Sequence, residues 1–125
     1  MWMTAIYVAL GGGIGATLRF LTGVYVGRWA NGTFPLGVLC ANVIGCFLMG
    51  LVVVYLGQKS MNAWQPFLMT GILGGYTTFS AFSLEAFTLI ENGLIGQGVL
   101  YILLSVFVSI AALILGIMIA RGIWA

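Results

Sequence analysis

Long apolar stretches interrupted by single charged residues dominate the chain. The six charged side chains leave uncharged runs of 18, 8, 30, 25, 5, 29 and 4 residues. A helix needs about 20 apolar residues to cross a bilayer, whereas a transmembrane strand needs only ~10 and alternates apolar with polar positions. The pattern therefore predicts a single all-α membrane domain over residues 1–125, with four transmembrane helices at about residues 4–26, 36–56, 63–90 and 98–120.

The third predicted span contains a weak helical stretch near its middle. Gly74 and Gly75 precede a run rich in β-branched and hydroxylated residues, residues 76–83. Glycine and β-branched residues are poor helix formers. Glycines at four-residue spacing, such as Gly71 and Gly75, also permit close helix packing, which alone could explain them. The adjoining threonines and serine favour a real break, and a break at membrane depth frees backbone carbonyls that can bind a cation.

Composition agrees with an integral membrane protein and excludes several functions. Of the 125 residues, 62% are hydrophobic and 5% are charged, and there is no histidine. A soluble domain carries about 25% charged residues. No segment remains for a soluble catalytic domain, four basic residues make no nucleic-acid surface, and sites that need imidazole are absent. We expect a membrane protein without enzymatic activity.

The distribution of basic residues gives no firm orientation. Four spans place Lys59 and Arg121 on one side of the membrane, and Arg28 on the other, with Arg19 added if its side chain reaches that boundary. Such a balance does not specify which side faces the cytoplasm. The chain is therefore expected to insert in both orientations and to pair with its own inverted copy. A single orientation set by another signal is the alternative.

Several polar side chains recur inside the predicted spans. Asn42 lies in the second span, where its amide could donate hydrogen bonds to a dehydrated anion. Taken alone, it is better explained by a hydrogen bond to a neighbouring helix. In the fourth span, Tyr101, Ser105 and Ser109 recur every four residues and share one helical face. Three aligned hydroxyls suggest a polar track, although a membrane serine usually bonds its own backbone.

The aromatic and hydroxylated residues of the third span suggest an anion path. Phe79 and Phe82 are three residues apart, and Thr78 and Ser80 stand beside them. Membrane phenylalanines usually contact lipid or the protein core. A ring edge is electropositive, however, so these rings together with nearby hydroxyls could attract an anion without trapping it.

Two charged side chains lie well inside the spans. Arg19 could attract anions at a vestibule, and its long side chain could reach the boundary. Glu85 could anchor a hydrogen-bond network, or it could carry a proton.

Three segments of the chain resemble the bacterial fluoride channels of the Fluc (CrcB) family. The most specific is GGYTTFSAFSLE at residues 74–85, and the others are GGGIGATLRF at residues 11–20 and FPLGVLCANVIG at residues 34–45. Together with the length and the four spans, the resemblance covers the whole chain. Ala81 departs from the family, which often has a hydroxylated residue between the two phenylalanines.

The resemblance implies an antiparallel, dual-topology homodimer in a bacterial inner membrane. Its two fluoride pores would give passive, electrodiffusive efflux of cytoplasmic fluoride. A structural sodium ion, which is not transported, would lie at the dimer centre on the carbonyls of Gly74 and Thr77 from both copies. Arg19 would be the vestibule arginine. By similarity the pore residues would be the paired phenylalanines, the span-two asparagine and the hydroxyl track: Asn42, Phe79, Phe82, Tyr101, Ser105 and Ser109.

Two other functions remain compatible with four short spans. A proton-coupled small multidrug exporter would need an embedded carboxylate, and Glu85 is the candidate. That class carries its carboxylate in the first helix, where this chain has Arg19 and no acid. An accessory subunit that only packs helices would explain the glycines but not the paired phenylalanines or the hydroxyl track.

Overall fold

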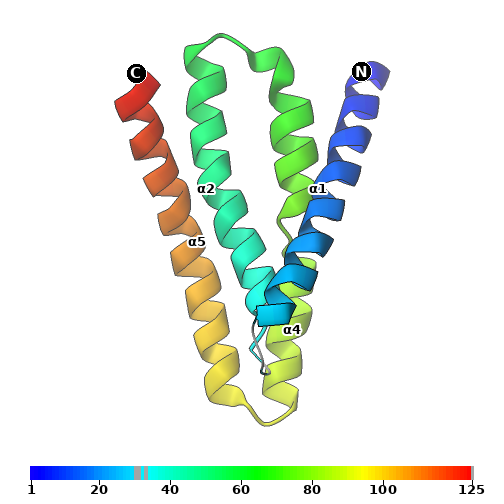
Figure 1. The fold of residues 1–125 in the computed structure, drawn as a ribbon, viewed down its shortest axis with the longest axis vertical. Coiled ribbons are helices and arrows are strands. Elements are labelled where there is room, and N and C mark those ends of the chain that lie inside the picture. Colours follow the sequence, from blue (N-terminus) through cyan, green and yellow to red (C-terminus); the bar gives the residue numbers. More distant parts are fainter. Residues whose placement is uncertain (30–31, 33, 125) are drawn as a thin grey trace.

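Four long helical rods make up the protein. The computed structural model describes residues 1–29, 32 and 34–124 (Figure 1). Helix α1 covers Trp2–Trp29, α2 covers Leu36–Gln58 and α5 covers Ile95–Trp124. The third rod consists of η1 (Asn62–Trp64), the π-helical η2 (Pro66–Leu73), α3 (Gly74–Tyr76) and α4 (Ser80–Glu91). Among the described residues, these four rods are long and apolar enough to cross a membrane.

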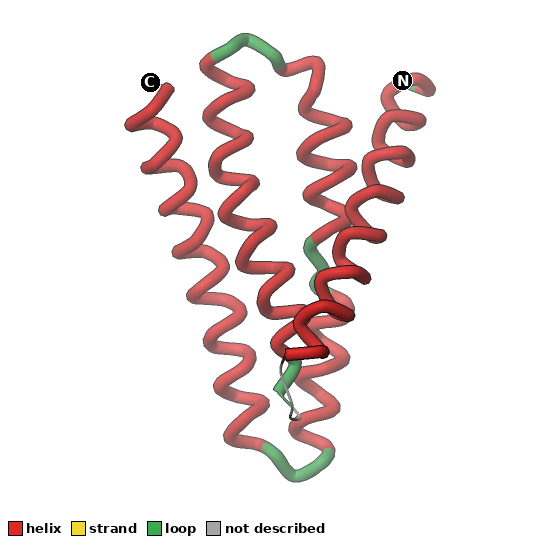
Figure 2. Tube along the Cα trace, in the orientation of Figure 1, coloured by secondary structure: helices red, strands yellow, loops and turns green. Residues whose placement is uncertain are grey.

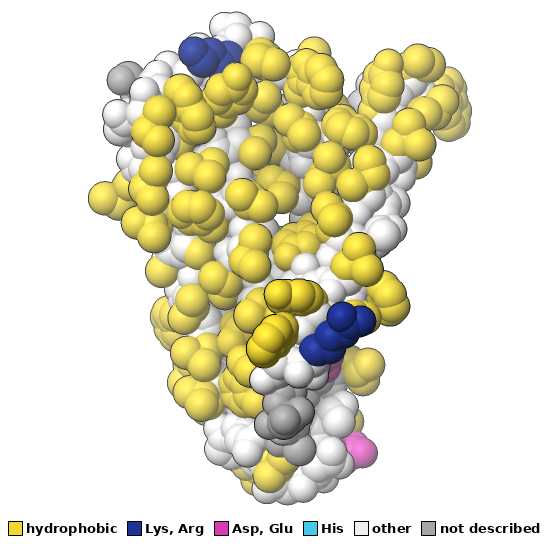
Figure 3. Space-filling view, in the orientation of Figure 1, with side chains coloured by type: hydrophobic (Ala, Val, Ile, Leu, Met, Phe, Trp, Pro, Cys, Tyr) yellow, Lys and Arg dark blue, Asp and Glu magenta, His cyan; other side chains and the backbone are white. Residues whose placement is uncertain are grey.

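The rods run alternately up and down. Both chain ends and the turn that follows α2 lie at one end of the molecule, whereas the turn between α4 and α5 lies at the other (Figure 1). Apolar side chains cover most of the visible face, and charged atoms are few (Figure 3). Many large apolar side chains are exposed, among them Trp2 and Trp29 near the two ends of α1. Such a surface suits lipid, because apolar side chains are at home in hydrocarbon and a helix satisfies its own backbone hydrogen bonds there.

The predicted break in the third span is confirmed. Figure 2 shows a non-helical stretch in the middle of this rod, at Thr77–Phe79. Thr77 has extended backbone angles (φ −84°, ψ 156°), and α4 restarts at Ser80. Gly74 and Gly75 are themselves helical in α3, so the chain breaks at the threonines that follow the glycines rather than at the glycines.

Glycines bring the helix backbones into close contact, as their spacing predicts. Helix α1 packs chiefly against η2 and α3, and its only buried residues among those described are Gly11 and Gly15. A Cβ added at Gly11 would lie 2.6 Å from the Phe67 carbonyl oxygen. Helices α2 and α5 form the other extensive contact, where Gly50 and Gly116 each face the partner backbone. Close backbone approach of this kind is how membrane helices associate without a hydrophobic driving force.

We expect Gly15→Ala to destabilise the fold by about 1–3 kcal/mol, since overpacking a close contact costs this much. The new Cβ would overlap the Ile72 carbonyl oxygen and lie 2.8 Å from the Tyr76 nitrogen. Gly13→Ala is the matched control, because no heavy atom lies within 4 Å of a Cβ at Gly13. Thermal unfolding in detergent measures both variants. Equal midpoints for the two would show that α1 does not pack on the third rod in this way.

Candidate functional site

The break in the third rod is held open by the side chain of Asn42. The amide nitrogen of Thr78 donates a hydrogen bond to Asn42 Oδ1 at 2.8 Å. Asn42 Nδ2 in turn donates to the Thr78 carbonyl oxygen at 2.9 Å. Residues 36 positions apart are thereby joined by two hydrogen bonds. The structure thus gives Asn42 the helix-to-helix role that is the better explanation of an isolated membrane asparagine, and its second Nδ2 hydrogen is still available for another acceptor.

The same contacts release two carbonyl groups from the helical ladder. In a continuous helix the amide of Thr78 would donate to the Gly74 carbonyl, and the amide of Ala81 would donate to the Thr77 carbonyl. Here the Thr78 amide bonds to Asn42, and the Ala81 amide bonds to Thr78 Oγ1 at 3.2 Å. The carbonyls of Gly74 and Thr77 therefore lose their helical donors, as the predicted break requires.

An open groove of about 460 Å³ runs along α2, the break and α5. It brings together most of the residues that the sequence singles out for an anion path and a cation site. Its polar lining comes from Asn42, Cys46, Thr77, Thr78, Ser105 and Ser109, and the rest of the lining is Gly74, Phe79, Phe82, Val106 and Ile110. None of the described residues that line the groove is charged, so the groove offers hydrogen-bond donors without a fixed charge that would hold an ion tightly.

Two hydroxyl groups of the groove are buried and unpaired. Ser105 and Ser109 are 7% and 8% exposed, and neither hydroxyl oxygen has a partner at full hydrogen-bond geometry among the described residues, although the Tyr101 hydroxyl lies near Ser105 and the Cys46 thiol lies near Ser109. Other hydroxyls behave differently: Thr17 and Thr88 each donate to the carbonyl four residues earlier in their own helix. Buried polar groups are nearly always hydrogen-bonded, so two buried hydroxyls without a partner need an explanation. A polar occupant of the groove would supply the missing partner.

Three aromatic rings continue from the groove towards the turn between α4 and α5. The centroids of Phe79 and Phe82 are 5.5 Å apart, and Phe82 lies 5.3 Å from Tyr101. Phe82 is 8% exposed and belongs to the core, whereas Phe79 is 77% exposed. Phe79 directly precedes α4 with helical backbone angles (φ −94°, ψ −33°), and its carbonyl accepts from the Ser83 N–H at 2.9 Å, so the two rings lie three residues apart at the start of this helix.

Tyr101 and Glu85 lie beyond the groove rather than in it. The Tyr101 side chain is fully buried, and its hydroxyl donates to Glu85 Oε2 at 3.5 Å. Tyr101, Ser105 and Ser109 are all buried on α5, which agrees with one shared face. Glu85 therefore belongs to a hydrogen-bonded pair, and its role in a wider network stays a prediction.

Ser80 and Arg19 also lie outside the lining of the groove. Ser80 is exposed, and its Oγ is 3.3 Å from Thr78 Oγ1. Arg19 is half-buried on α1 and has no hydrogen bond or ion pair with another described residue. The structure does not bring Arg19 to the groove, and its vestibule role stays a prediction.

Sequence reasoning missed two features of this region. The first is Cys46, which lines the groove one helical turn beyond Asn42. Its four-residue distance from Asn42 was a usable signal, since it puts both on one face of α2. The second feature is a hydrogen bond between the Thr22 hydroxyl and the Tyr76 hydroxyl at 2.8 Å, which joins α1 to the rod just before the break. No local pattern in the sequence indicates that contact.

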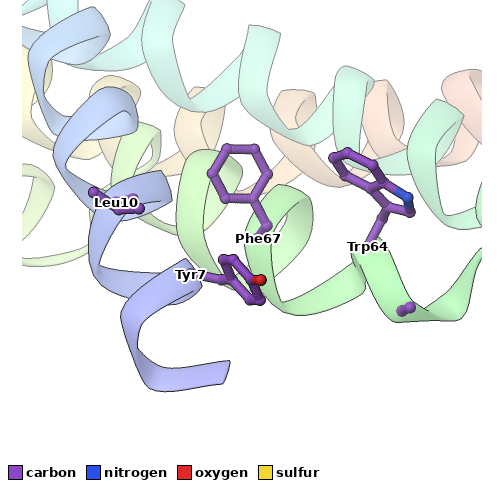
Figure 4. A pocket seen from close by; sticks show the side chains of 5 residues that line it. Tyr7, Leu10, Trp64 and Phe67 are labelled. Atoms are coloured by element: carbon purple, nitrogen blue, oxygen red, sulfur yellow. The ribbon is translucent and has the colours of Figure 1, made fainter. Parts of the chain in front are cut away.

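A second hollow of about 430 Å³ lies between α1 and the start of the third rod (Figure 4). It is lined by Tyr7, Leu10, Ala63, Trp64 and Phe67. Figure 4 shows mainly rings and aliphatic carbon around it. Because it lacks a set of converging donors, this hollow cannot replace the hydration shell of a small anion.

Comparison with known proteins identifies one family. A family model described as "CrcB-like protein, Camphor Resistance (CrcB)" matches residues 6–117. The "Fluoride-specific ion channel FluC" of Ruegeria sp. (strain TM1040) is 56% identical over 124 residues, which cover 98% of each chain. The protein of the same name from Roseobacter denitrificans is 49% identical over 121 residues, 95% of this chain and 96% of that one. A third, from Flavobacterium psychrophilum, is 44% identical over 122 residues, 94% of this chain and 97% of its own.

Proposed function

The chain belongs to the CrcB-like protein family, and from this premise we propose that it is a fluoride-selective channel for passive fluoride efflux. It is a multi-pass protein of a bacterial membrane. Fluoride enters cells as neutral hydrogen fluoride and dissociates in the less acidic cytoplasm. A channel lets the anion leave down the membrane potential, which supplies ~2.3 kcal/mol per charge for each 100 mV.

The observation that carries this proposal is the groove between α2, the break and α5. Fluoride is small and strongly hydrated, so a pore must replace its water shell with well-placed donors. The unpaired hydroxyls of Ser105 and Ser109 supply two such donors, and the second Nδ2 hydrogen of Asn42 supplies another. The electropositive edges of Phe79 and Phe82 would hold the ion weakly enough for it to leave.

The exposed side of the groove supports a homodimer. Phe79 is 77% exposed, Gly74 is also exposed, and the Gly74 carbonyl has lost its helical donor at the middle of a membrane span. Irregular backbone at this depth is tolerated only when protein or a watery cavity covers it. A second copy of the chain would cover it, and the balanced basic residues at the two ends suit an inverted copy and dual topology.

The freed carbonyls of Gly74 and Thr77 fit a structural cation. Sodium is a hard cation that prefers oxygen ligands, and unwound backbone carbonyls provide them in membrane proteins. Two carbonyls from one chain are too few to surround a cation, but the same pair from an inverted copy would double the number. Bound sodium would tie the two copies together at the break without being transported.

No observation favours a proton-coupled multidrug exporter. Glu85 accepts a hydrogen bond from the buried Tyr101 and does not line the groove. The three relatives compared above are all named as fluoride-specific ion channels.

Expression of the chain should restore growth to a bacterium that lacks its own fluoride exporter, at fluoride concentrations that arrest the host. The reason is that an open anion path lowers cytoplasmic fluoride until the gradient balances the membrane potential. Growth is scored across a series of fluoride concentrations, with the empty plasmid as the control. If the protein reaches the membrane and tolerance does not rise, the proposed function is wrong.

A further inference from the structure

The contact between Asn42 and Thr78 is unusual, because one side chain satisfies both backbone groups of a residue in another helix. Its Oδ1 accepts from the Thr78 N–H and its Nδ2 donates to the Thr78 carbonyl, at 2.8 and 2.9 Å. Thr78 is the central residue of the non-helical stretch. The N–H and the carbonyl of Thr78 are thereby satisfied without water, although the helix is broken at this residue.

This contact decides whether the Gly74 carbonyl is free. A regular helix through residue 78 would return the Thr78 N–H to that carbonyl. Asn42 competes for the same N–H and keeps it, while Thr78 Oγ1 takes the Ala81 N–H that would otherwise bond to Thr77. The two carbonyls that could hold a cation are therefore available only while Asn42 and Thr78 hold the break open.

We propose that Asn42 is a positioning residue that couples the groove to the cation site by holding the backbone of Thr78. This inference rests on the proposed function and deepens it. Because Asn42 lines the groove while its amide fixes Thr78, occupation of the carbonyls and the shape of the groove depend on one contact. Such coupling is reciprocal: a cation that favours the open break also favours the conducting shape of the groove.

Two simpler roles for Asn42 predict different results. If Asn42 only donates to the anion, its removal lowers fluoride flux and leaves the response to sodium unchanged. If it only joins two helices, its removal lowers stability by the same amount with and without sodium. The positioning role alone predicts a changed response to sodium.

The test compares thermal unfolding of the purified protein over a series of sodium concentrations, with N-methylglucamine as the replacement cation. The wild type should be stabilised by sodium. In Asn42→Ala, half-maximal stabilisation should require about tenfold more sodium, within the usual range of coupling between two sites. Thr88→Ala is the matched control, since it also removes a side-chain bond to a backbone carbonyl, but on the exposed side of α4. Its sodium dependence should equal that of the wild type.

A second measurement needs no variant. In the wild type, hydrogen–deuterium exchange of a peptide covering residues 76–82 should be slower in sodium than in N-methylglucamine, because bound sodium stabilises the open break and with it the Thr78 hydrogen bond.

The inference is overturned if Asn42→Ala and the wild type reach half-maximal thermal stabilisation at the same sodium concentration. If that variant does not fold, equal exchange of residues 76–82 in the two salts overturns it. Neither measurement uses fluoride. Fluoride efflux by the wild type, recorded on the same preparation, therefore separates failure of this inference from failure of the proposed function.

Discussion

Replacing Phe82 by isoleucine should slow fluoride efflux by about tenfold or more, equivalent to ~1.4 kcal/mol of barrier. Phe82 lies where the groove meets the aromatic rings, 5.5 Å from Phe79 and 5.3 Å from Tyr101. Isoleucine keeps an apolar side chain but has no electropositive edge, so the anion loses a weak attraction beside Phe79. The initial rate of fluoride release from liposomes measures the effect.

Phe87→Ile is the control for this prediction. Phe87 is on the same helix, α4, but it is 60% exposed and does not line the groove. Its replacement should leave the efflux rate near that of the wild type. Equal rates for the Phe82 variant, the Phe87 variant and the wild type would show that the ion does not pass the aromatic pair.

Replacing Ser105 and Ser109 together by alanine should nearly abolish fluoride efflux and yet should not destabilise the protein. Each buried hydroxyl that lacks a partner costs about 1–3 kcal/mol, and alanine removes that cost. Each hydroxyl is also a donor that replaces water around the ion, so its loss raises the barrier to permeation. Efflux and thermal unfolding are measured on the same preparation.

The serine prediction is specific because fluoride efflux should be lost while the stability of the fold is retained. Thr17→Ala serves as the control, because its hydroxyl is exposed and donates to the Gly13 carbonyl of its own helix. It should change neither efflux nor stability by much. Normal efflux from the double serine variant would show that the hydroxyls of α5 do not line the ion path.

The sequence predicted the helices well because local periodicity determines their faces. Four spans, a break in the third and a shared buried face for Tyr101, Ser105 and Ser109 are all present in the structure. The close approach at Gly11 and Gly15 also followed from their spacing. Each of these features depends on residues within a few turns of one another, where helical geometry fixes direction.

Contacts between helices could not be predicted in the same way. The bonds from Asn42 to Thr78 and from Thr22 to Tyr76 join residues far apart in sequence, and they depend on how the helices cross. The π-helical segment Pro66–Leu73 changes the register of the third rod before the break. No simple repeat in the sequence indicates that change.

The exposure of Phe79 could not be predicted from the sequence, and it bears on how two copies of the chain assemble. Residue type alone does not distinguish a ring that faces lipid from one that lines a groove, and this ring is 77% exposed and lines the groove. One chain alone therefore leaves the path open on one side. We expect the second copy to close it.

Fluoride conduction by this protein is best measured as fluoride efflux from liposomes that contain the purified chain. Vesicles are loaded with potassium fluoride or potassium chloride, and a potassium ionophore starts the release, which an ion-selective electrode records. We expect rapid fluoride release that depends on the ionophore, because electrodiffusive flux requires charge compensation. Chloride should leave at least about tenfold more slowly. If fluoride stays inside vesicles that contain the folded protein, or if chloride leaves as fast as fluoride, the protein is not a fluoride-selective channel.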